Sequence, residues 1–256
     1  MLRFAANLGW LFTEHDFLDR FAAAARAGFR AVEFAAPYAY PPEEIAMRLL
    51  DNGLECILIN LPMGDRAKGD VGIACRPERR AEFREGVERG IVYAQALGVP
   101  RMNVIAGLAH AGEDPVALRA TLVENLGYAA AELAKVKLDL LVEPLNDIDT
   151  PGFLVTRQAQ GVELMNEVRA ANFGLQFDLY HVAMMGEEPL AALDRHRAAI
   201  RHIQFADAPG RGEPGTGRVD YAPIFERIDG QGYTGWVAAE YRPSRETAQT
   251  LSWFVR

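Results

Sequence analysis

The feature that most limits what this chain can fold into is an alternation of short apolar runs with longer amphipathic stretches, repeated along its whole length. Short apolar runs bounded by turn residues are typical of buried strands, and apolar residues at helical spacing are typical of helices packed on one face. A chain that alternates the two is expected to form a parallel sheet covered by helices. The predicted strands are Arg3–Leu8, Ala31–Phe34, Leu54–Leu61, Arg101–Ile105, Leu138–Glu143, Phe173–Phe177, Arg201–Phe205 and Trp236–Glu240.

A helix is predicted after each of these strands, and glycine, proline or a capping residue marks several of the boundaries. The first helix is expected to begin at Glu14 behind a Thr13 cap and to end at Gly28, a residue type that favours helix termination. Proline is accepted in the first turn of a helix, so it marks helix starts further along the chain. The other predicted helices are Pro42–Asn52, Pro77–Leu97, Pro115–Val136, Gln158–Ala171, Pro189–Ala199, Tyr221–Gly230 and Ser244–Phe254.

Eight strand–helix units in 256 residues match the size of one closed barrel. We therefore predict an α/β fold, a single (β/α)8 TIM barrel, with one domain over residues 1–256. A doubly wound open sheet is the rival architecture, but it normally carries a glycine-rich phosphate loop after its first strand, and Asn7-Leu8-Gly9-Trp10-Leu11 is not such a loop. In a TIM barrel the chemistry lies at the C-terminal ends of the strands, so functional residues are expected there.

Composition excludes several classes of partner. A formal net charge of −8 leaves no surplus of lysine and arginine for a phosphate backbone, so nucleic acid is not an expected partner. No apolar run approaches the roughly 20 residues needed to cross a bilayer, and no membrane association is expected. The two cysteines, Cys56 and Cys75, form no paired motif and are expected to be reduced thiols in a cytoplasmic protein.

Oxygen-donor side chains end four consecutive predicted strands. Glu143, Asp178, Gln204 and Glu240 are separated by 35, 26 and 36 residues, about one strand–helix repeat each. The barrel would bring them together around its mouth, although any single strand-end acid is more often a solvated loop residue. Three carboxylates in a partly buried site repel one another unless a cation lies among them, and oxygen ligands suit Mg²⁺ or Mn²⁺. A divalent metal site is therefore predicted, with Gln204 as its least specific member.

Three further side chains are candidates for binding substrate. His181 follows Asp178 by three residues, where a structural histidine is an equal alternative. Arg211 lies in the loop after the seventh strand, where its guanidinium could hold a carboxylate with two hydrogen bonds, unless it is a surface arginine. Asn7 could reach the pocket from the first strand. His202, in contrast, is expected to point away from Gln204.

The chain resembles the hydroxypyruvate isomerase family, within the xylose isomerase-like barrel superfamily that also holds sugar epimerases and endonuclease IV. The resemblance extends over essentially the whole chain, and its most specific segments are Glu143-Pro144-Leu145-Asn146, Asp178-Leu179-Tyr180-His181, residues 204–217 and Glu240-Tyr241-Arg242-Pro243. It implies a metal bound by Glu143, Asp178, Gln204 and Glu240, with Glu143 and Glu240 also acting as the catalytic acid/base pair. The chain departs from the family's pattern at Arg218, where an acidic residue is expected, and at Gly9-Trp10, where Ser and Met are more usual.

The expected activity is the metal-dependent interconversion of hydroxypyruvate and tartronate semialdehyde, by proton transfer through an enediolate between the two glutamates. A 2-oxo-tetronate isomerase or a ketose 3-epimerase would use the same residues and remains an alternative. An endonuclease IV-like nuclease is disfavoured by five scattered histidines and the negative charge. A barrel that binds a sugar acid without converting it stays open, as does assembly into a homo-oligomer.

Overall fold

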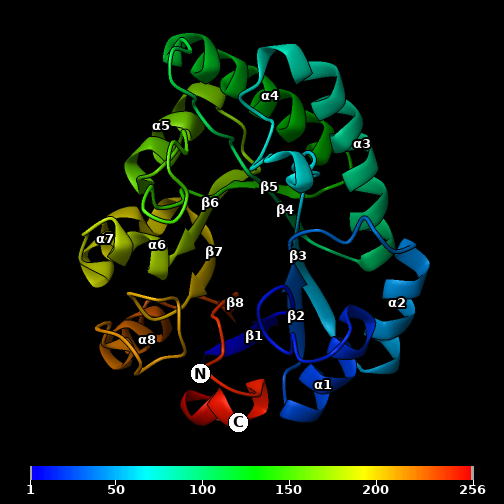
Figure 1. The fold of residues 1–256 in the computed structure, drawn as a ribbon, viewed down its shortest axis with the longest axis vertical. Helices are drawn as coiled ribbons and strands as arrows, with labels where there is room; N and C mark the ends of the chain where they lie inside the picture. The colour runs from blue at the N-terminus through cyan, green and yellow to red at the C-terminus, as the bar shows by residue number, and fades with distance from the viewer. Residues whose placement is uncertain (1, 255–256) are drawn as a thin grey trace.

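The computed structural model describes residues 2–254 and contains a closed barrel of eight parallel strands in chain order. In Figure 1 the helices form a ring outside these strands, so the predicted (β/α)8 barrel is confirmed. The strands are β1 (Arg3–Asn7), β2 (Ala31–Phe34), β3 (Glu55–Asn60), β4 (Arg101–Val104), β5 (Asp139–Val142), β6 (Phe173–Asp178), β7 (Ile200–Phe205) and β8 (Trp236–Ala239).

The helical layer follows the predicted order, with differences at both ends of the chain and after β6. A short helix begins directly after β6, where none was predicted, because the Asp178 side chain accepts the Tyr180 backbone N–H and caps it. The α-helices are α1 (Arg20–Ala27), α2 (Pro42–Asp51), α3 (Arg80–Leu97), α4 (Pro115–Lys135), α5 (Gln158–Val168), α6 (Leu179–Met184), α7 (Pro189–His196) and α8 (Tyr221–Gly230). Short 3-10 helices are η1 (Phe17–Asp19), η2 (Arg66–Lys68), η3 (Pro77–Arg79), η4 (Arg197–Ala199) and η5 (Thr247–Trp253).

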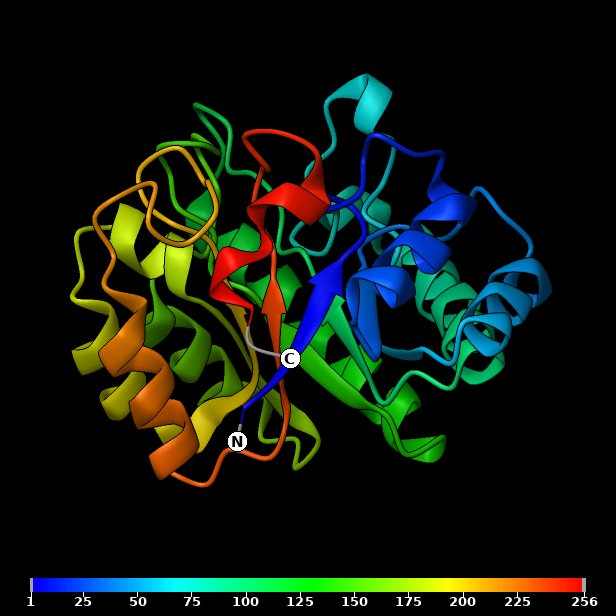
Figure 2. The ribbon, with the colours of Figure 1, turned by 90° about the horizontal axis from the view of Figure 1, so that it is seen from below.

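The first helix begins later than predicted, because the Glu14 side chain binds the C-terminal segment of the chain. Its carboxylate accepts hydrogen bonds from the backbone N–H and the hydroxyl of Thr247, and the Thr247 hydroxyl in turn accepts the N–H of Phe12. These bonds hold the segment after β1 against the C-terminal segment, which lies beside β1 in Figure 2. The predicted Ser244–Phe254 helix is reduced to η5, while Gly28 ends α1 in the left-handed conformation as predicted.

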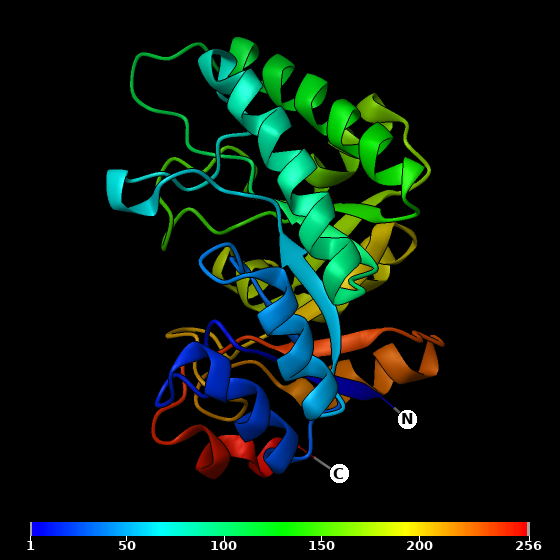
Figure 3. The ribbon, with the colours of Figure 1, turned by 90° about the vertical axis from the view of Figure 1, so that its right-hand side faces the viewer.

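The core lies between the barrel and its helices, and small residues set how closely the helices approach. A Cβ atom on Gly90 of α3 would lie 2.5 Å from Leu61 Cδ2 and 2.7 Å from Met102 Cε, so the helix packs on the strands through its glycine backbone. The side view in Figure 3 shows α3 beside α4 over these strands. Each fully buried large apolar side chain in this layer contributes roughly 1.5–3 kcal/mol of stability.

The strands all point the same way, and the loops that follow them gather at one end of the barrel (Figure 2). Two strand pairs contain a register shift, between Val32 and Glu33 in β2 and between Leu175 and Gln176 in β6. Such irregularities re-aim the side chains beside them and occur often near active sites. The second lies between β6 and β7, the strands that carry Asp178 and Gln204.

Two sequence expectations concern the chain as a whole. Cys56 and Cys75 are buried free thiols, and burial raises the pKa of each, that of Cys75 to about 11. Among residues 2–254, no helix combines the length and apolar character required to cross a membrane.

Candidate active site at the carboxyl ends of the strands

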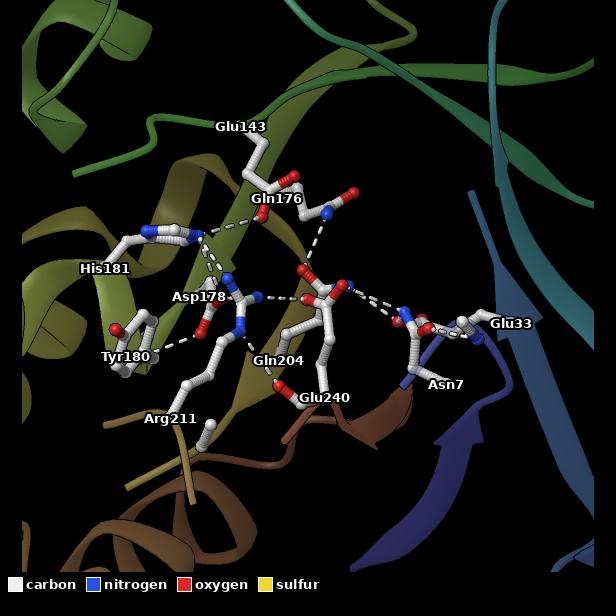
Figure 4. Close-up of polar contacts among 12 residues, drawn as sticks. Asn7, Glu33, Glu143, Gln176, Asp178, Tyr180, His181, Gln204, Arg211 and Glu240 are labelled. Atoms are coloured by element: carbon white, nitrogen blue, oxygen red, sulfur yellow. Dashed lines mark hydrogen bonds and ion pairs between the residues drawn. The ribbon is translucent and has the colours of Figure 1, made fainter. Parts of the chain in front are cut away.

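The four predicted metal ligands meet at the mouth of the barrel, as Figure 4 shows. Glu143 directly follows β5, Asp178 ends β6, Gln204 lies near the end of β7, and Glu240 directly follows β8. Asp178 and Gln204 are paired on neighbouring strands. Glu143, Asp178 and Gln204 are at most 5% exposed, and the Glu240 side chain is 12% exposed. Three carboxyl groups are thus confined within a site almost closed to water.

Arg211 lies among these acids. Its Nη2 atom is 3.1 Å from Asp178 Oδ2 and 3.0 Å from Glu240 Oε2, and its Nε donates to the Glu240 backbone oxygen at 3.1 Å. The guanidinium is 4.5 Å from the ring centre of Trp10 and 4.9 Å from that of Tyr180, so two aromatic faces also contact it. The predicted arginine is therefore a nearly buried part of the site and not a surface residue.

A buried aspartate organises the loop that carries Arg211. The Asp207 carboxylate accepts four backbone N–H groups, from Ala208 (2.9 Å), Gly215 (2.9 Å), Gly217 (2.8 Å) and Val219 (3.0 Å). Gly217 is required because a Cβ there would lie 2.5 Å from both the Ala208 oxygen and Asp207 Oδ1. Glu213 ties the same loop to the segment after β8 by accepting the backbone N–H and hydroxyl of Ser244. These contacts fix the guanidinium on a rigid loop.

The hydrogen bonds around His181 determine its tautomer. Nδ1 accepts the backbone N–H of Asn146 at 3.0 Å, so it cannot carry a proton. In the neutral ring the proton is then on Nε2, which lies 3.4 Å from Asp178 Oδ2 and 3.9 Å from Glu143 Oε1. Arg211 Nη1, 3.3 Å away, is also only a donor and so does not pair with this N–H. Burial, with a smaller contribution from Arg211, lowers the pKa of His181 well below its ordinary value. His181 is therefore a neutral group that offers an N–H to the site.

The carboxyl groups hold their protons more tightly than exposed ones. Burial is the largest cause for Glu143, followed by the negative charges of Glu240 and Asp178, and together they raise its pKa well above the ordinary value. Burial also raises the pKa of Asp178, although Arg211 opposes the shift. For Glu240, burial outweighs the opposing effect of Arg211 and raises the pKa to about 8. A carboxyl group with a pKa of about 8, as at Glu240, can exchange protons near neutral pH, as acid–base catalysis requires.

The donor set fits a hard divalent cation. Glu143, Asp178 and His181 each place a potential ligand atom within 4.8 Å of the other two. His181 is disfavoured as a ligand because its Nε2 carries a proton, whereas Gln204 and Glu240 supply oxygen atoms. Glu240 Oε2 is buried, and apart from its ion pair with Arg211 Nη2 at 3.0 Å it accepts no hydrogen bond within the described chain. Carboxylate and amide oxygens around a residual negative charge suit Mg²⁺ or Mn²⁺.

Sequence reasoning missed a layer of polar residues beneath the four predicted ligands. Glu33, fully buried in β2, accepts hydrogen bonds from Asn7 Nδ2 at 2.8 Å and from Gln204 Nε2 at 2.6 Å, and it lies 2.6 Å from His202 Nε2. The expectation that His202 points away from Gln204 is wrong. Residues two apart on a strand face the same side, so both side chains enter the barrel. This period of two could have been read from the sequence.

Asn7 reaches the site, where its side chain donates to the carboxyl groups of Glu33 and Glu240. Its Nδ2 atom donates to Glu33 and to Glu240 Oε1 at 3.1 Å, and its Oδ1 atom accepts the N–H of Gly9. Trp10 lies over Arg211, whereas Arg218 reaches the carbonyl oxygen of Ala183, 3.5 Å away at the end of α6. Of the two departures from the family pattern, the one at Trp10 therefore borders the site.

A protein-family model and several known proteins match this chain over nearly its whole length. The family described as xylose isomerase-like TIM barrel matches residues 21–256. The chain is 47% identical to hydroxypyruvate isomerase of Escherichia coli K12 over 99% of its own length and 98% of that protein. It is 45% identical to 2-oxo-tetronate isomerase of Cupriavidus necator, over 99% of this chain and 97% of that one.

Solved structures agree on the fold. A Brucella melitensis protein described as an AP endonuclease of family 2 superposes with a TM-score of 0.96 at 39% identity, covering 99% of this chain and 98% of that one. A 3-keto-D-glucoside 4-epimerase from E. coli superposes with a TM-score of 0.81 at 19% identity, covering 99% and 98% of the two chains. The second likeness concerns the barrel alone.

Proposed function

Because this chain belongs to the xylose isomerase-like TIM barrel family and is an aldose–ketose type isomerase, we propose that it interconverts hydroxypyruvate and tartronate semialdehyde. The observation that carries the proposal is the pair of buried glutamates, Glu143 after β5 and Glu240 after β8, whose pKa values are raised. The two strands are separated by β6 and β7 in the ring, so the two carboxyl groups approach a substrate from different sides. Such an arrangement favours proton removal by one group and proton delivery by the other.

The reaction moves hydrogen between neighbouring carbons without an external oxidant. One glutamate takes a proton from C3 of hydroxypyruvate, which leaves an enediolate, and the other delivers a proton to C2 while the C3 hydroxyl proton passes to the oxygen on C2. When bound by Glu143, Asp178, Gln204 and Glu240, Mg²⁺ or Mn²⁺ would supply a Lewis acid that stabilises negative charge on the substrate oxygens.

His181 and Arg211 are the groups available to hold the substrate in place. The neutral Nε2–H of His181 and Nη1 of the Arg211 guanidinium can each donate to a substrate oxygen, whereas Nε and Nη2 of the arginine already donate to Glu240 and Asp178. Trp10 and Tyr180 restrict the position of that guanidinium, which favours one orientation of the carboxylate. A small hydroxy-carbonyl acid is therefore the proposed substrate class. The net charge of −8 gives no support to nucleic acid as a partner, and the buried thiols favour a cytoplasmic location.

A 2-oxo-tetronate is the second candidate substrate, because the relative from C. necator carries that name at 45% identity. It presents the same carbonyl and neighbouring hydroxyl next to a carboxylate, with one further carbon. The two candidates place the same demands on the glutamates and differ only in the space required beyond the reacting carbons.

The test is proton NMR in D₂O of hydroxypyruvate and of a 2-oxo-tetronate, with protein that has been treated with chelator and then reloaded with Mg²⁺. Glu143→Gln and Glu240→Gln are expected to reduce conversion by about 10²- to 10⁴-fold each, because each removes a proton-transferring group. Glu226→Gln, on the exposed face of α8, is the matched control and should react as the wild type does. Conversion that persists in both active-site variants, or without metal, would contradict the proposal.

A further inference from the structure

We infer that Glu33 is a positioning residue of the metal site: its buried carboxylate fixes the amide of Gln204 with the oxygen toward the metal and strengthens that oxygen as a ligand. The inference rests on the proposed metal-dependent function and deepens it. Glu33 lies at the end of β2, on a strand that carries none of the four proposed ligands. Its side chain is nevertheless fully buried and directed into the barrel, as Figure 4 shows.

The contacts of Glu33 form one connected network. Its Oε1 atom accepts from Gln204 Nε2 at 2.6 Å and from Asn7 Nδ2 at 2.8 Å, and its Oε2 atom lies 2.6 Å from His202 Nε2. A carboxylate only accepts, so all three partners must present N–H groups to it. Because Asn7 also donates to Glu240, Glu33 is linked to two of the four proposed ligands.

Glu33 determines which end of the Gln204 amide faces the metal. The reversed amide would place its oxygen 2.6 Å from a carboxylate oxygen, which is repulsive. The Gln204 oxygen is therefore turned to the other side, where it accepts a hydrogen bond from Gln176 Nε2 at 2.6 Å. An amide oxygen has two lone pairs, so one remains for a cation.

The negative charge of Glu33 also acts through the amide. A hydrogen bond from an amide N–H to a carboxylate draws electron density toward the amide oxygen, and chains of hydrogen bonds in a low-dielectric interior reinforce one another. Partners behind a ligand commonly change metal affinity by 10- to 100-fold. A neutral amide ligand with a buried carboxylate behind it is thus a stronger donor than an amide without such a partner.

The backbone of β7 adds a second observation. Where Leu175 and Gln176 pair with Ile200 and His202, β7 carries one extra residue, Arg201. This bulge directly precedes His202 and Gln204, two of the residues that contact Glu33, and a bulge re-aims the side chains beside it. The irregular strand is thus the one that carries the Gln204 amide.

The experiment compares Mn²⁺ affinity, measured by isothermal titration calorimetry, in Glu33→Gln and in the charge exchange Glu33→Gln with Gln204→Glu. The single variant is expected to bind Mn²⁺ about 10- to 100-fold more weakly. The exchange keeps a hydrogen bond between positions 33 and 204 and moves the charge onto the ligand, so affinity should recover toward the wild-type value. Glu55→Gln, on the exposed start of β3, removes the same charge outside the site and is the matched control. Saturating Mn²⁺ should restore kcat in Glu33→Gln, since Glu33 does not touch the substrate.

The outcomes separate this inference from the proposed function. Wild-type protein that binds neither Mn²⁺ nor Mg²⁺ would overturn both. Wild-type binding with unchanged affinity in Glu33→Gln, or failure of the exchange to recover affinity in a folded protein, would overturn the role of Glu33 alone. If Glu33→Gln does not fold, ¹⁵N NMR of the wild type tests the inference instead. The signal of the Gln204 side-chain amide is assigned by its loss in Gln204→Glu, and it should show one exchange-protected, downfield N–H. An ordinary solvent-exposed signal would refute the inference.

Discussion

Glu240 should make the metal-free protein less stable as the pH rises above neutrality. Burial raises its pKa from 4.5 to about 8, so the folded state keeps a proton that the unfolded chain has already lost. The resulting stabilisation is complete below pH 4.5 and disappears as the pH rises through the folded value. Each such group changes the free energy of unfolding by about 1.4 kcal/mol per pH unit within that window. His181 has the opposite effect below its unfolded pKa, since its own pKa is lowered, and the clearest window therefore lies between pH 6.5 and 8.

The measurement is urea unfolding in the presence of a chelator at pH 6.5 and at pH 8, for the wild type and for Glu240→Gln. Glutamine does not titrate, so the variant should lose roughly 2 kcal/mol less stability across this interval than the wild type does. Glu226→Gln provides the exposed control and should follow the wild type. Equal pH dependence in the wild type and Glu240→Gln would show that the Glu240 carboxyl titrates as an ordinary exposed group and would refute the argument from burial.

Three other substitutions test separate parts of the site. Asp207→Asn replaces an acceptor of four backbone N–H groups by a side chain with only one acceptor oxygen, so urea unfolding should show a free energy of unfolding lower by about 1–3 kcal/mol. Asp220→Asn, at an exposed helix cap, should change the free energy of unfolding little. Arg211→Gln removes the positive charge that lowers the pKa of Glu240, so ¹³C NMR titration of the metal-free protein should give a Glu240 pKa above the wild-type value. An unchanged pKa would contradict the ion pair between Arg211 and Glu240. His181→Asn should raise KM and leave Mn²⁺ affinity near the wild-type value, because the protonated Nε2 is a donor to substrate; lost Mn²⁺ binding would make His181 a ligand instead.

The barrel could be predicted because its signal is local and repeated. Each strand is a short apolar run and each helix has apolar residues at helical spacing, so β1 to β8 follow from the pattern alone. The ends of the chain could not be predicted in this way. Glu14 and Thr247 meet across 233 residues, and their hydrogen bonds displace the first helix and leave only η5 at the C-terminus. Contacts between distant segments override the local preference for helix, and they produce no periodic pattern in the sequence.

The four oxygen donors were found because they end strands, and the spacing of strand ends is visible in the sequence. Gln176 lies two residues before Asp178, and His202 lies two residues before Gln204, so the period of two already places each of them on the inward side of its strand. Glu33 is different, because β2 ends in no oxygen donor whose spacing could mark the inward side of that strand.

The charges at the mouth explain why metal and protons should compete there. Glu33, Glu143, Asp178 and Glu240 bring four carboxyl groups together, and Arg211 is the cation in contact with two of them. Burial, together with the neighbouring negative charges, raises the pKa values of Glu143 and Glu240, so some of these carboxyl groups keep protons. If a divalent cation binds there as proposed, it would neutralise the same charge and lower the pKa values of these carboxyl groups. Its binding would therefore release protons and strengthen as the pH rises. The two glutamates would then be ionised, or ready to ionise, only when the metal is in place, which ties their availability as bases to the presence of the ion.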